Sequence, residues 1–551
     1  MEIEALTATR DFHTRESARH SALLSPIKRT PNDILSSIFI ALVAHPDNRN
    51  ADMSNTHPAV VISHVCEHWR ELALETSALW STIKVTPPIF PQRFGYLEDS
   101  VVSTTEHGTR PMIDLLRRWE RCVKWNLDTA RVWISRSKDS NISVTFHVSD
   151  DVPEFSTLEG TARDLEGWER MTTLLAELSE VVCASHHRWV TADLHLVTSR
   201  SVTASPLKPF MDIKADEVPS LRRLKIAVVI VGDGLNSSPF GRDHQENILS
   251  GKALQDIHLS YSSIDFRQMH LRWGQLTQLR FDVGPQIVFK EKEAIQLLRM
   301  CQNLVKCDLG LYTDDTNAMP LDGGLVRLPR LESITVRGRA PQVEFASVLD
   351  TPRLRRLIIP GVPHLAGSST EANSVVLAWI RDYGHQLTEV AFNIARFTQS
   401  AFSLCMSNLP NVTSLRLLAP SSNLLHPNLN DQTSLTRDFF ERLAPHTESQ
   451  KVAVAPAWCP RLEGIRLPEG QGFTEADLLE FVIAKRRTNA LSRLRSVRAF
   501  FPTLQEVDIP ERLREMGVDT DGLTVRVSYP ARMPLRPWAK FVNIASEDEE
   551  Y

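Results

Sequence analysis

The feature that most limits how this 551-residue chain can fold is a short apolar phrase that recurs from residue 219 onward. An apolar residue, most often leucine, occupies the first, fourth and sixth positions of the phrase. Most steps between successive copies are 22 to 33 residues long, a period at which repeat proteins add one supersecondary unit after another. The ten copies begin at Leu221, Leu254, Leu276, Leu304, Leu331, Leu354, Leu387, Val412, Leu462 and Leu494.

Each copy predicts one short strand, because alternate apolar side chains can point into a shared core. Helical segments such as 292–301 and 475–487 lie between copies, and the helix-then-strand order already occurs at 112–135 with 141–148 and at 164–185 with 188–196. One copy alone would arise readily by chance, but ten in quasi-regular order would not. The sequence therefore predicts an α/β (α+β repeat) fold, with a curved, irregular leucine-rich repeat solenoid over residues 87–528.

Residues 23–86 have a different pattern and predict a small helical domain. Thr30 followed by Pro31 is typical of a helix N-cap with proline in the first helical position. A stripe of apolar residues at three- and four-residue steps follows, and a second amphipathic helix is expected from about Pro58. The stripe consists of Ile34, Leu35, Ile38, Phe39 and Leu42, and the second helix carries Val61, Val65, Trp69, Leu72 and Ala73.

The first of these helices carries more apolar surface than a bundle of about 60 residues can bury internally, and a bundle of that size is marginally stable alone. We therefore expect this face to dock onto another protein. The bundle closes in a strand-like phrase with Leu79, Trp80, Ile83 and Val85.

The segment from Ser25 to Val85 resembles the F-box of fungal, basidiomycete-type F-box proteins. The residues that carry the resemblance are Pro31, Asp33, Ile34, Leu35, Ile38, Phe39, Val65, Cys66, Trp69, Arg70, Leu79 and Trp80. The family usually has leucine before the proline, whereas this chain has Thr30, which removes an apolar contact from the expected docking edge. The segments RWVTADLHL, LRWGQLTQLRF, LLRMCQNLVKCDL and DLLEFVIAKRR extend the resemblance to about Val527.

The resemblance implies a small F-box bundle that binds a Skp-type adaptor and, through it, a cullin scaffold of a ubiquitin ligase. The repeat region would then bind a target protein, whose identity the resemblance does not give. The implied adaptor-binding residues are Pro31, Ile34, Leu35, Ile38, Phe39, Val65, Cys66, Trp69 and Trp80.

Composition narrows the remaining classes of function. Lysine and arginine total 62 against 67 aspartates and glutamates, and the pI near 6.4 gives no global field for nucleic acid. No apolar run approaches the length of a membrane-spanning helix, so we expect neither nucleic acid nor membrane as a partner and a cytoplasmic or nuclear location. Seven cysteines without C-x-x-C spacing predict reduced, mostly buried thiols. Residues 1–22 predict a flexible tail or frayed helix, and residues 529–551 a disordered acidic tail.

The strongest catalytic candidate is HVCEH, in which His64, Glu67 and His68 have the H-x-x-E-H spacing of a zinc peptidase helix. Because Val65 and Trp69 have packing positions on the same expected helix, solvent-facing histidines are favoured over a metal site. Gly232-Asp233-Gly234 follows an apolar strand without completing a phosphate-binding pattern. We expect no catalytic, cofactor-binding or metal-binding residues, and therefore a non-catalytic protein.

Two hypotheses remain open from the sequence. In the first, the chain is an F-box adaptor that recognises the substrate of a Skp-cullin-F-box ubiquitin ligase. In the second, it is a repeat scaffold for protein interactions without a ligase, and the helical bundle only caps the solenoid.

Overall fold

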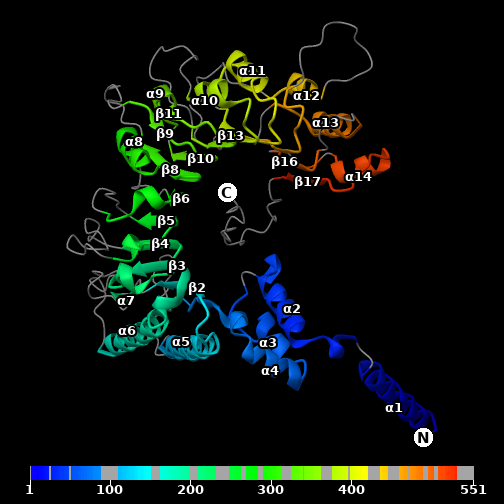
Figure 1. Cartoon of the computed structure of the whole chain (residues 1–551). Coiled ribbons are helices and arrows are strands. Elements are labelled where there is room, and N and C mark those ends of the chain that lie inside the picture. Colours follow the sequence, from blue (N-terminus) through cyan, green and yellow to red (C-terminus); the bar gives the residue numbers. More distant parts are fainter. Residues whose placement is uncertain are drawn as a thin grey trace. The chain divides into compact units, whose positions relative to one another are not determined.

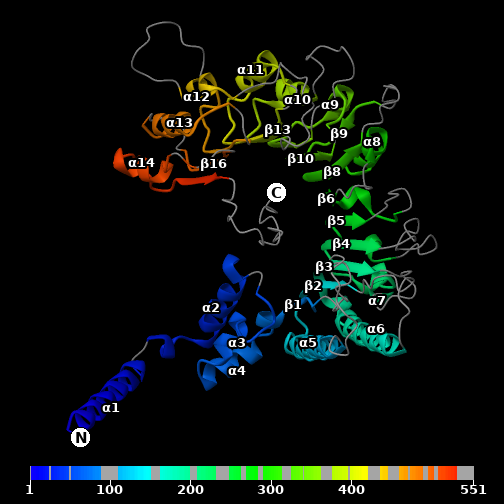
Figure 2. The same cartoon turned by 180° about the vertical axis from the view of Figure 1, so that it is seen from behind.

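A computed structural model describes the chain in segments that together form a mixed α/β protein (Figure 1 and Figure 2). The chain divides into two compact units, Met1–Arg272 and Trp273–Tyr551, and each contains parallel strands connected by helices. The described residues are 2–23, 26–48, 51–88, 109–149, 162–198, 208–230, 247–261, 269–282, 289–312, 324–338, 340–361, 375–394, 397–419, 435–444, 458–468, 472–487, 494–501, 505 and 507–529.

The first unit begins with helices α1 (Glu2–Leu23), α2 (Asn32–Ala44), α3 (Pro58–Ser63) and α4 (Glu67–Glu75), with short 3-10 turns at Pro26–Arg29, Pro46–Asn48 and Ser77–Trp80. Of the two alternatives for residues 1–22, the structure has the helix. The prediction that Thr30 caps the next helix is wrong by one residue. Pro31 is the N-cap of α2, and its carbonyl accepts the first helical bond from the Leu35 N–H at 3.0 Å.

The single second helix expected over the HVCEH segment is two helices. His57 caps α3 through its Nδ1, which accepts a hydrogen bond from the Ala59 N–H at 3.2 Å. The helix ends at Ser63, and the extended backbone of Cys66, with φ −158° and ψ 170°, separates it from α4. The Arg70 Nε then donates to the Ser63 carbonyl at 3.0 Å, which holds the two short helices together.

Five parallel strands follow in the first unit: β1 (Thr82–Val85), β2 (Ile142–Ser149), β3 (Trp189–Thr198), β4 (Arg223–Ile230) and β5 (Asp256–Tyr261). The crossovers carry α5 (Thr109–Arg136), α6 (Ala162–Cys183) and α7 (Lys208–Met211). The predicted helices and strands at 112–135, 141–148, 164–185 and 188–196 are therefore confirmed within a few residues. Strand β1 lies inside the expected 23–86 domain yet pairs with β2, so the helical segment runs directly into the sheet.

The second unit continues the same plan with one helix between most strands. Its main strand order is β6-β8-β10-β12-β13-β14-β15-β16-β17, and the short strand β7 pairs with β8 while β9 pairs with β11. The helices of this unit lie on one side of its strands (Figure 1). The strands are β6 (Gln278–Phe281), β7 (Phe289–Lys290), β8 (Lys306–Tyr312), β9 (Val326–Arg327), β10 (Ser333–Gly338), β11 (Leu349–Asp350), β12 (Arg356–Ile359), β13 (Glu389–Asn393), β14 (Ser414–Leu418), β15 (Gly464–Arg466), β16 (Ser496–Phe500) and β17 (Thr524–Ser528). The helices are α8 (Glu291–Met300), α9 (Val343–Val348), α10 (Val375–Tyr383), α11 (Gln399–Ser407), α12 (Arg437–Leu443), α13 (Glu475–Arg487) and α14 (Ile509–Glu515).

Every copy of the apolar phrase leads into a strand, so the strand predicted for each copy is confirmed. The ten residues at the first position, from Leu221 to Leu494, are each 0% exposed. The fourth positions stack in register, so that Leu357, Val390, Leu415, Ile465 and Val497 are neighbours on successive strands. Because each copy buries its apolar positions against the next copy, the core is continuous within the unit.

Five of the seven cysteines are buried free thiols, as expected for a reduced protein. Burial raises the pKa of the Cys301, Cys405 and Cys459 thiols to about 12, so they are protonated at neutral pH. Cys183 and Cys307 are also buried, whereas Cys66 is exposed and Cys122 is half-buried.

Several expectations fall outside the described residues: the loop at 420–434, the Gly232-Asp233-Gly234 turn and all of the acidic tail after Tyr529. Across the helices that the structure does describe, none has the length and apolar character needed to cross a bilayer.

Candidate docking surfaces

The N-terminal bundle is built around a small aromatic core. Trp80 is fully buried, its Nε1 donates to the Ala73 carbonyl at 2.8 Å, and its ring meets Trp133 of α5 edge-on at 4.9 Å between centroids. The Arg136 guanidinium lies 4.4 Å from the centroid of the same ring, a cation–π distance. Trp80 therefore joins the helices that precede β1 to the helix that follows it.

Two residues of α2 complete this core from the other side. Leu35 and Phe39 are each 1% exposed, and the Phe39 ring contacts the half-buried Trp69 ring of α4 at 5.0 Å. Ser36 lies between them in sequence, and its hydroxyl is 3.3 Å from that of Thr76. One edge of α2 is thus fixed against α4 and the turn that follows it.

The adjacent edge of α2 is uncovered. Ile34 is 49% exposed and Ile38 is 47% exposed, and Leu42 continues the row at the next four-residue step. Val61 of α3 and Val65 of the turn after it are also more than half exposed. We call Ile34, Ile38, Leu42, Val61 and Val65 the apolar edge of the bundle.

The nine residues implied to bind an adaptor therefore separate into two groups. Pro31, Ile34, Ile38, Val65 and Cys66 are exposed and could contact a partner directly. Leu35, Phe39 and Trp80 are buried in the bundle, so in this structure they support the exposed group from inside, and their contact with an adaptor stays a prediction. Trp69 is half-buried and belongs to neither group alone. Leu42 and Val61 were not among the nine, although the helical spacing of apolar residues was a signal for both.

The HVCEH segment does not have the geometry of a metallopeptidase helix. His64 follows the end of α3 and His68 lies in α4, so the two residues are not on successive turns of one helix. Both side chains are exposed. Within the described part of the chain, no group of three histidine, cysteine or carboxylate side chains is placed to hold a metal ion.

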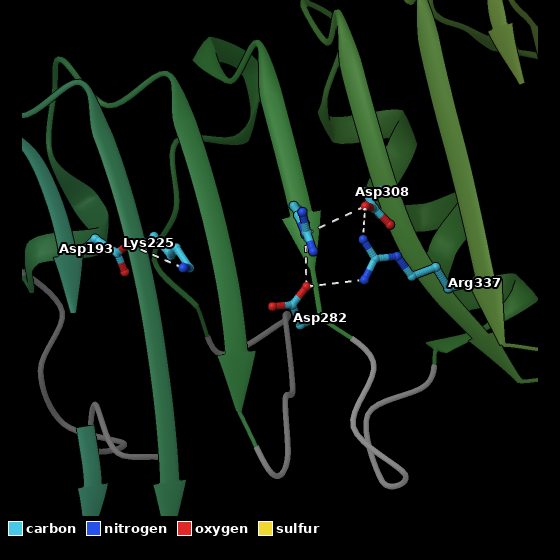
Figure 3. A network of polar contacts seen from close by, with 6 residues as sticks. Asp193, Lys225, Asp282, Asp308 and Arg337 are labelled. Carbon is cyan, nitrogen blue, oxygen red and sulfur yellow. Dashed lines mark hydrogen bonds and ion pairs between the residues drawn. The ribbon is translucent and has the colours of Figure 1, made fainter. Parts of the chain in front are cut away.

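On the side of the strands away from the helices, charged residues of the second unit form a paired network at β6, β8 and β10 (Figure 3). Asp308 lies between two arginines: Arg337 Nη2 donates to its Oδ2 at 2.7 Å, and Arg280 Nε is 3.7 Å from the same oxygen. Asp282 also faces both arginines, with its Oδ1 2.9 Å from Arg280 Nε and 3.4 Å from Arg337 Nη1. The two arginines and the two aspartates thus alternate, and each charged group has two neighbours of opposite charge.

Burial determines the protonation behaviour of this network. Loss of solvent raises the pKa of Asp308, and the nearby Arg337 and Arg280 offset part of that rise without reversing it. The Asp308 carboxylate is therefore costly to keep charged without its arginines.

A smaller polar group lies on the strands of the first unit, where Asp193 of β3 and Lys225 of β4 are register partners (Figure 3). Their charged atoms are 3.3 Å apart, and His147 Nε2 lies 3.5 Å from the other oxygen of Asp193. Partial burial alone would raise the pKa of Asp193, but the neighbouring His147 and Lys225 outweigh burial and lower it. This is an ion-pair cluster that holds Asp193 ionised.

Comparison with known proteins adds little to this geometry. No protein-family profile matches the chain, and no curated protein matches it. Twelve chains of solved structures match, among them a crystal structure of a protein from Bacteroides fragilis, a structural genomics target. That protein is 12% identical over 67% of this chain and 84% of its own length, with a TM-score of 0.29. A TM-score this low carries no argument about fold or function.

Proposed function

We propose that this chain is an F-box adaptor, the substrate-recognition subunit of a Skp-cullin-F-box ubiquitin ligase. In this proposal residues 23–86 form the F-box bundle, the strands and helices after them form a leucine-rich repeat solenoid, and the two parts bind different proteins. The observation that carries the proposal is the apolar edge, which leaves Ile34 and Ile38 about half exposed within the segment that resembles an F-box.

Physical reasons favour docking over a simple cap. A terminal cap of a repeat array needs a polar outer face to stay soluble, whereas this bundle presents isoleucine and valine. Burying a half-exposed isoleucine or valine in an interface stabilises the complex by about 1 kcal/mol, so the apolar edge supplies several kcal/mol in total. Such a surface fits an apolar partner groove better than it fits water.

The role proposed is non-catalytic. A substrate receptor contributes by holding the lysine of a target close to a charged conjugating enzyme, which raises the effective concentration of the reacting groups. This role requires two binding surfaces and no nucleophile of its own.

Co-expression of the full chain with a Skp-type adaptor, followed by purification through a tag on the chain, tests the proposal. We expect the wild type to retain the adaptor and an Ile34→Asp, Ile38→Asp variant to lose it. The matched control is Leu404→Asp on α11, which adds a charge at a similarly exposed apolar position in the second unit. Substitution of Leu35 would be a poor control, because that side chain is in the core.

Failure of the folded wild type to bind any Skp-type adaptor would favour the second hypothesis, a repeat scaffold without a ligase. Thr30, which stands where the F-box pattern has leucine, would then account for the missing adaptor contact.

A further inference from the structure

The last four strands of the second unit carry arginine at matched register positions. Arg416 of β14 pairs with Arg466 of β15, Arg466 pairs with Arg498 of β16, and Arg498 pairs with Arg526 of β17. Register partners in a parallel sheet point to the same face, so the four side chains stand side by side. We call Arg416, Arg466, Arg498 and Arg526 the arginine row.

The row stands on the face of the sheet opposite the apolar core. The residues next to its members in sequence, such as Leu415, Ile465 and Val497, are buried in the apolar core and point the other way. The Arg498 and Arg526 side chains are exposed, while Arg466 is half-buried. The guanidinium groups can therefore reach a ligand that lies over the strands.

A hollow of about 180 Å³ lies beside the row. Two residues before the arginines, the same strands carry Ser414, Gly464 and Ser496, and these small residues line the hollow together with Arg416, Arg466 and Arg498. A Cβ placed on Gly464 would be 3.9 Å from the Ser496 Cβ and 4.0 Å from the Ser414 Oγ, which are ordinary van der Waals distances, so a small side chain fits at this position without a clash. The hollow thus combines hydroxyl groups, a glycine floor and three guanidinium groups.

The charge balance here differs from that of the network at β6, β8 and β10. There, two arginines face two aspartates, whereas the register partners of Arg466 and Arg498 are other arginines. Two glutamates border these strands, and both are engaged: Glu389 with Arg416 at 3.0 Å, and Glu463 with Arg495 at 3.4 Å. At the matched register positions of β14 to β17 the residue is therefore arginine on every strand, and none of the four positions holds a carboxylate.

We propose that the arginine row binds a short acidic segment of a partner protein, with the aspartate and glutamate carboxylates of that segment over the guanidinium groups. Arginine and carboxylate groups form charge-assisted, often bidentate hydrogen bonds. The row spans about 14 Å across four strands, roughly the length of four residues of extended chain. Under the proposed receptor role, the acidic segment belongs to the target protein. The residues that would bind it all lie in the second unit.

A peptide fits better than a nucleic acid. Single-stranded nucleic acids are held by aromatic side chains on which bases stack, and the residues that line this hollow are serine, glycine, leucine, isoleucine and arginine. Glu389 interrupts the positive charge at β13, and the whole chain carries a net charge of −5, which opposes a long polyanion.

Fluorescence polarisation of a labelled, glutamate-rich ten-residue peptide with the full chain tests the proposal, with a glutamine-for-glutamate peptide as the comparison. We expect binding of the acidic peptide only, weakened by added salt. Arg466→Ser together with Arg498→Ser should lower the affinity by about tenfold or more, because two charge-assisted contacts are lost. Lysine at the same two positions should restore part of it.

Two further variants separate charge from shape and position. Arg353→Ser with Arg355→Ser removes the same charge from exposed arginines beside β12 and should leave binding unchanged. Gly464→Val fills the hollow while keeping the arginines, and valine suits a strand, so it should weaken peptide binding without unfolding the protein.

The proposal is overturned if the folded wild type does not bind the acidic peptide, if the Arg466 and Arg498 serine variant binds it as well as wild type, or if a single-stranded oligonucleotide of equal charge binds more tightly. Adaptor binding is measured with the same protein preparations, so that failure of the arginine-row proposal can be told apart from failure of the proposed ligase role. A chain that binds the peptide but no adaptor supports the arginine row and contradicts the ligase role.

Discussion

The N-terminal bundle and the repeat strands contain the same kinds of apolar residue and use them differently. In the repeats, the ten residues at the first position of the phrase are completely buried, because each copy has a neighbouring copy to pack against. In the bundle, α2 buries Leu35 and Phe39 but leaves Ile34 and Ile38 about half exposed. The difference shows where the chain buries its own apolar surface and where apolar surface remains exposed.

The surfaces that the two regions expose also differ in chemistry. The bundle presents isoleucine and valine, whereas β6, β8 and β10 carry arginines and aspartates that pair between strands. If this comparison is correct, substitutions in the bundle core and in the paired network should cost stability, and substitutions on the apolar edge should cost binding alone.

The largest loss of stability is expected for Trp80→Ala. A buried tryptophan replaced by alanine costs about 3 to 5 kcal/mol, and here it also removes the hydrogen bond to Ala73 and the contact with Trp133. Chemical denaturation of the full chain, followed by a spectroscopic signal from the first unit, would measure this loss of stability. Trp125→Ala on α5, where the side chain is half exposed, is the matched control and should change stability by less than about 1 kcal/mol. Equal losses for the two tryptophans would contradict the assignment of the core.

A smaller loss, about 2 kcal/mol, is expected for Asp308→Asn, because removal of the carboxylate leaves Arg280 and Arg337 facing each other with less compensation. The measurement is the denaturation midpoint of the second unit. In the double variant Asp308→Asn, Arg337→Gln the loss should be less than the sum of the two single losses. Strict additivity would show that the two side chains do not stabilise each other.

A still smaller effect, visible as pH dependence, is expected at His57. Burial lowers the pKa of His57 from its usual 6.5, so the unfolded chain takes up a proton more readily than the folded one. Above pH 6.5 His57 is neutral in both states and does not reduce the free energy of unfolding. That free energy decreases as the pH falls from 6.5 toward the lower pKa of His57 in the folded chain. In His57→Asn, which keeps a side-chain cap for α3, the melting temperature should fall less between pH 8 and pH 5.5 than in wild type. An equal fall in melting temperature in both proteins would exclude His57 as a source of the pH dependence.

The smallest stability effect is expected for Ile38→Ala, at about 0.5 kcal/mol or less, because the side chain already contacts water over half its surface. Leu35→Ala, three residues earlier and fully buried, should cost about 2 to 5 kcal/mol in the same thermal or chemical denaturation. A large loss for Ile38→Ala would mean that the apolar edge is covered within the chain, and would remove the main argument for docking.

The sequence predicted the strands well and the contacts between them poorly, for one physical reason. Within a strand such as β14, the alternation of Leu415 and Leu417 with polar neighbours is local and fixes which side faces the core. The Asp308 network depends on which residue of one copy meets which residue of the next, across segments of variable length. Helical spacing likewise placed Ile34 and Leu35 on one stripe without showing which edge the neighbouring helices cover.

The arginine row could have been found from the sequence. Arg416, Arg466 and Arg498 each occupy the fifth position of their copy of the phrase, so aligning the copies puts them in one column. The helix break at His64–Cys66 had no comparable signal, because the apolar spacing runs through it unchanged.

The most direct test of the account is a calorimetric titration of a Skp-type adaptor into wild type, the Ile34→Asp, Ile38→Asp variant and the Arg466→Ser, Arg498→Ser variant. The account predicts equal affinity for wild type and the arginine variant, and at least a hundredfold loss for the isoleucine variant, about 2.7 kcal/mol or more. Equal affinity in all three proteins, or loss in the arginine variant as well, would contradict the claim that the apolar edge of the bundle is the adaptor-binding surface.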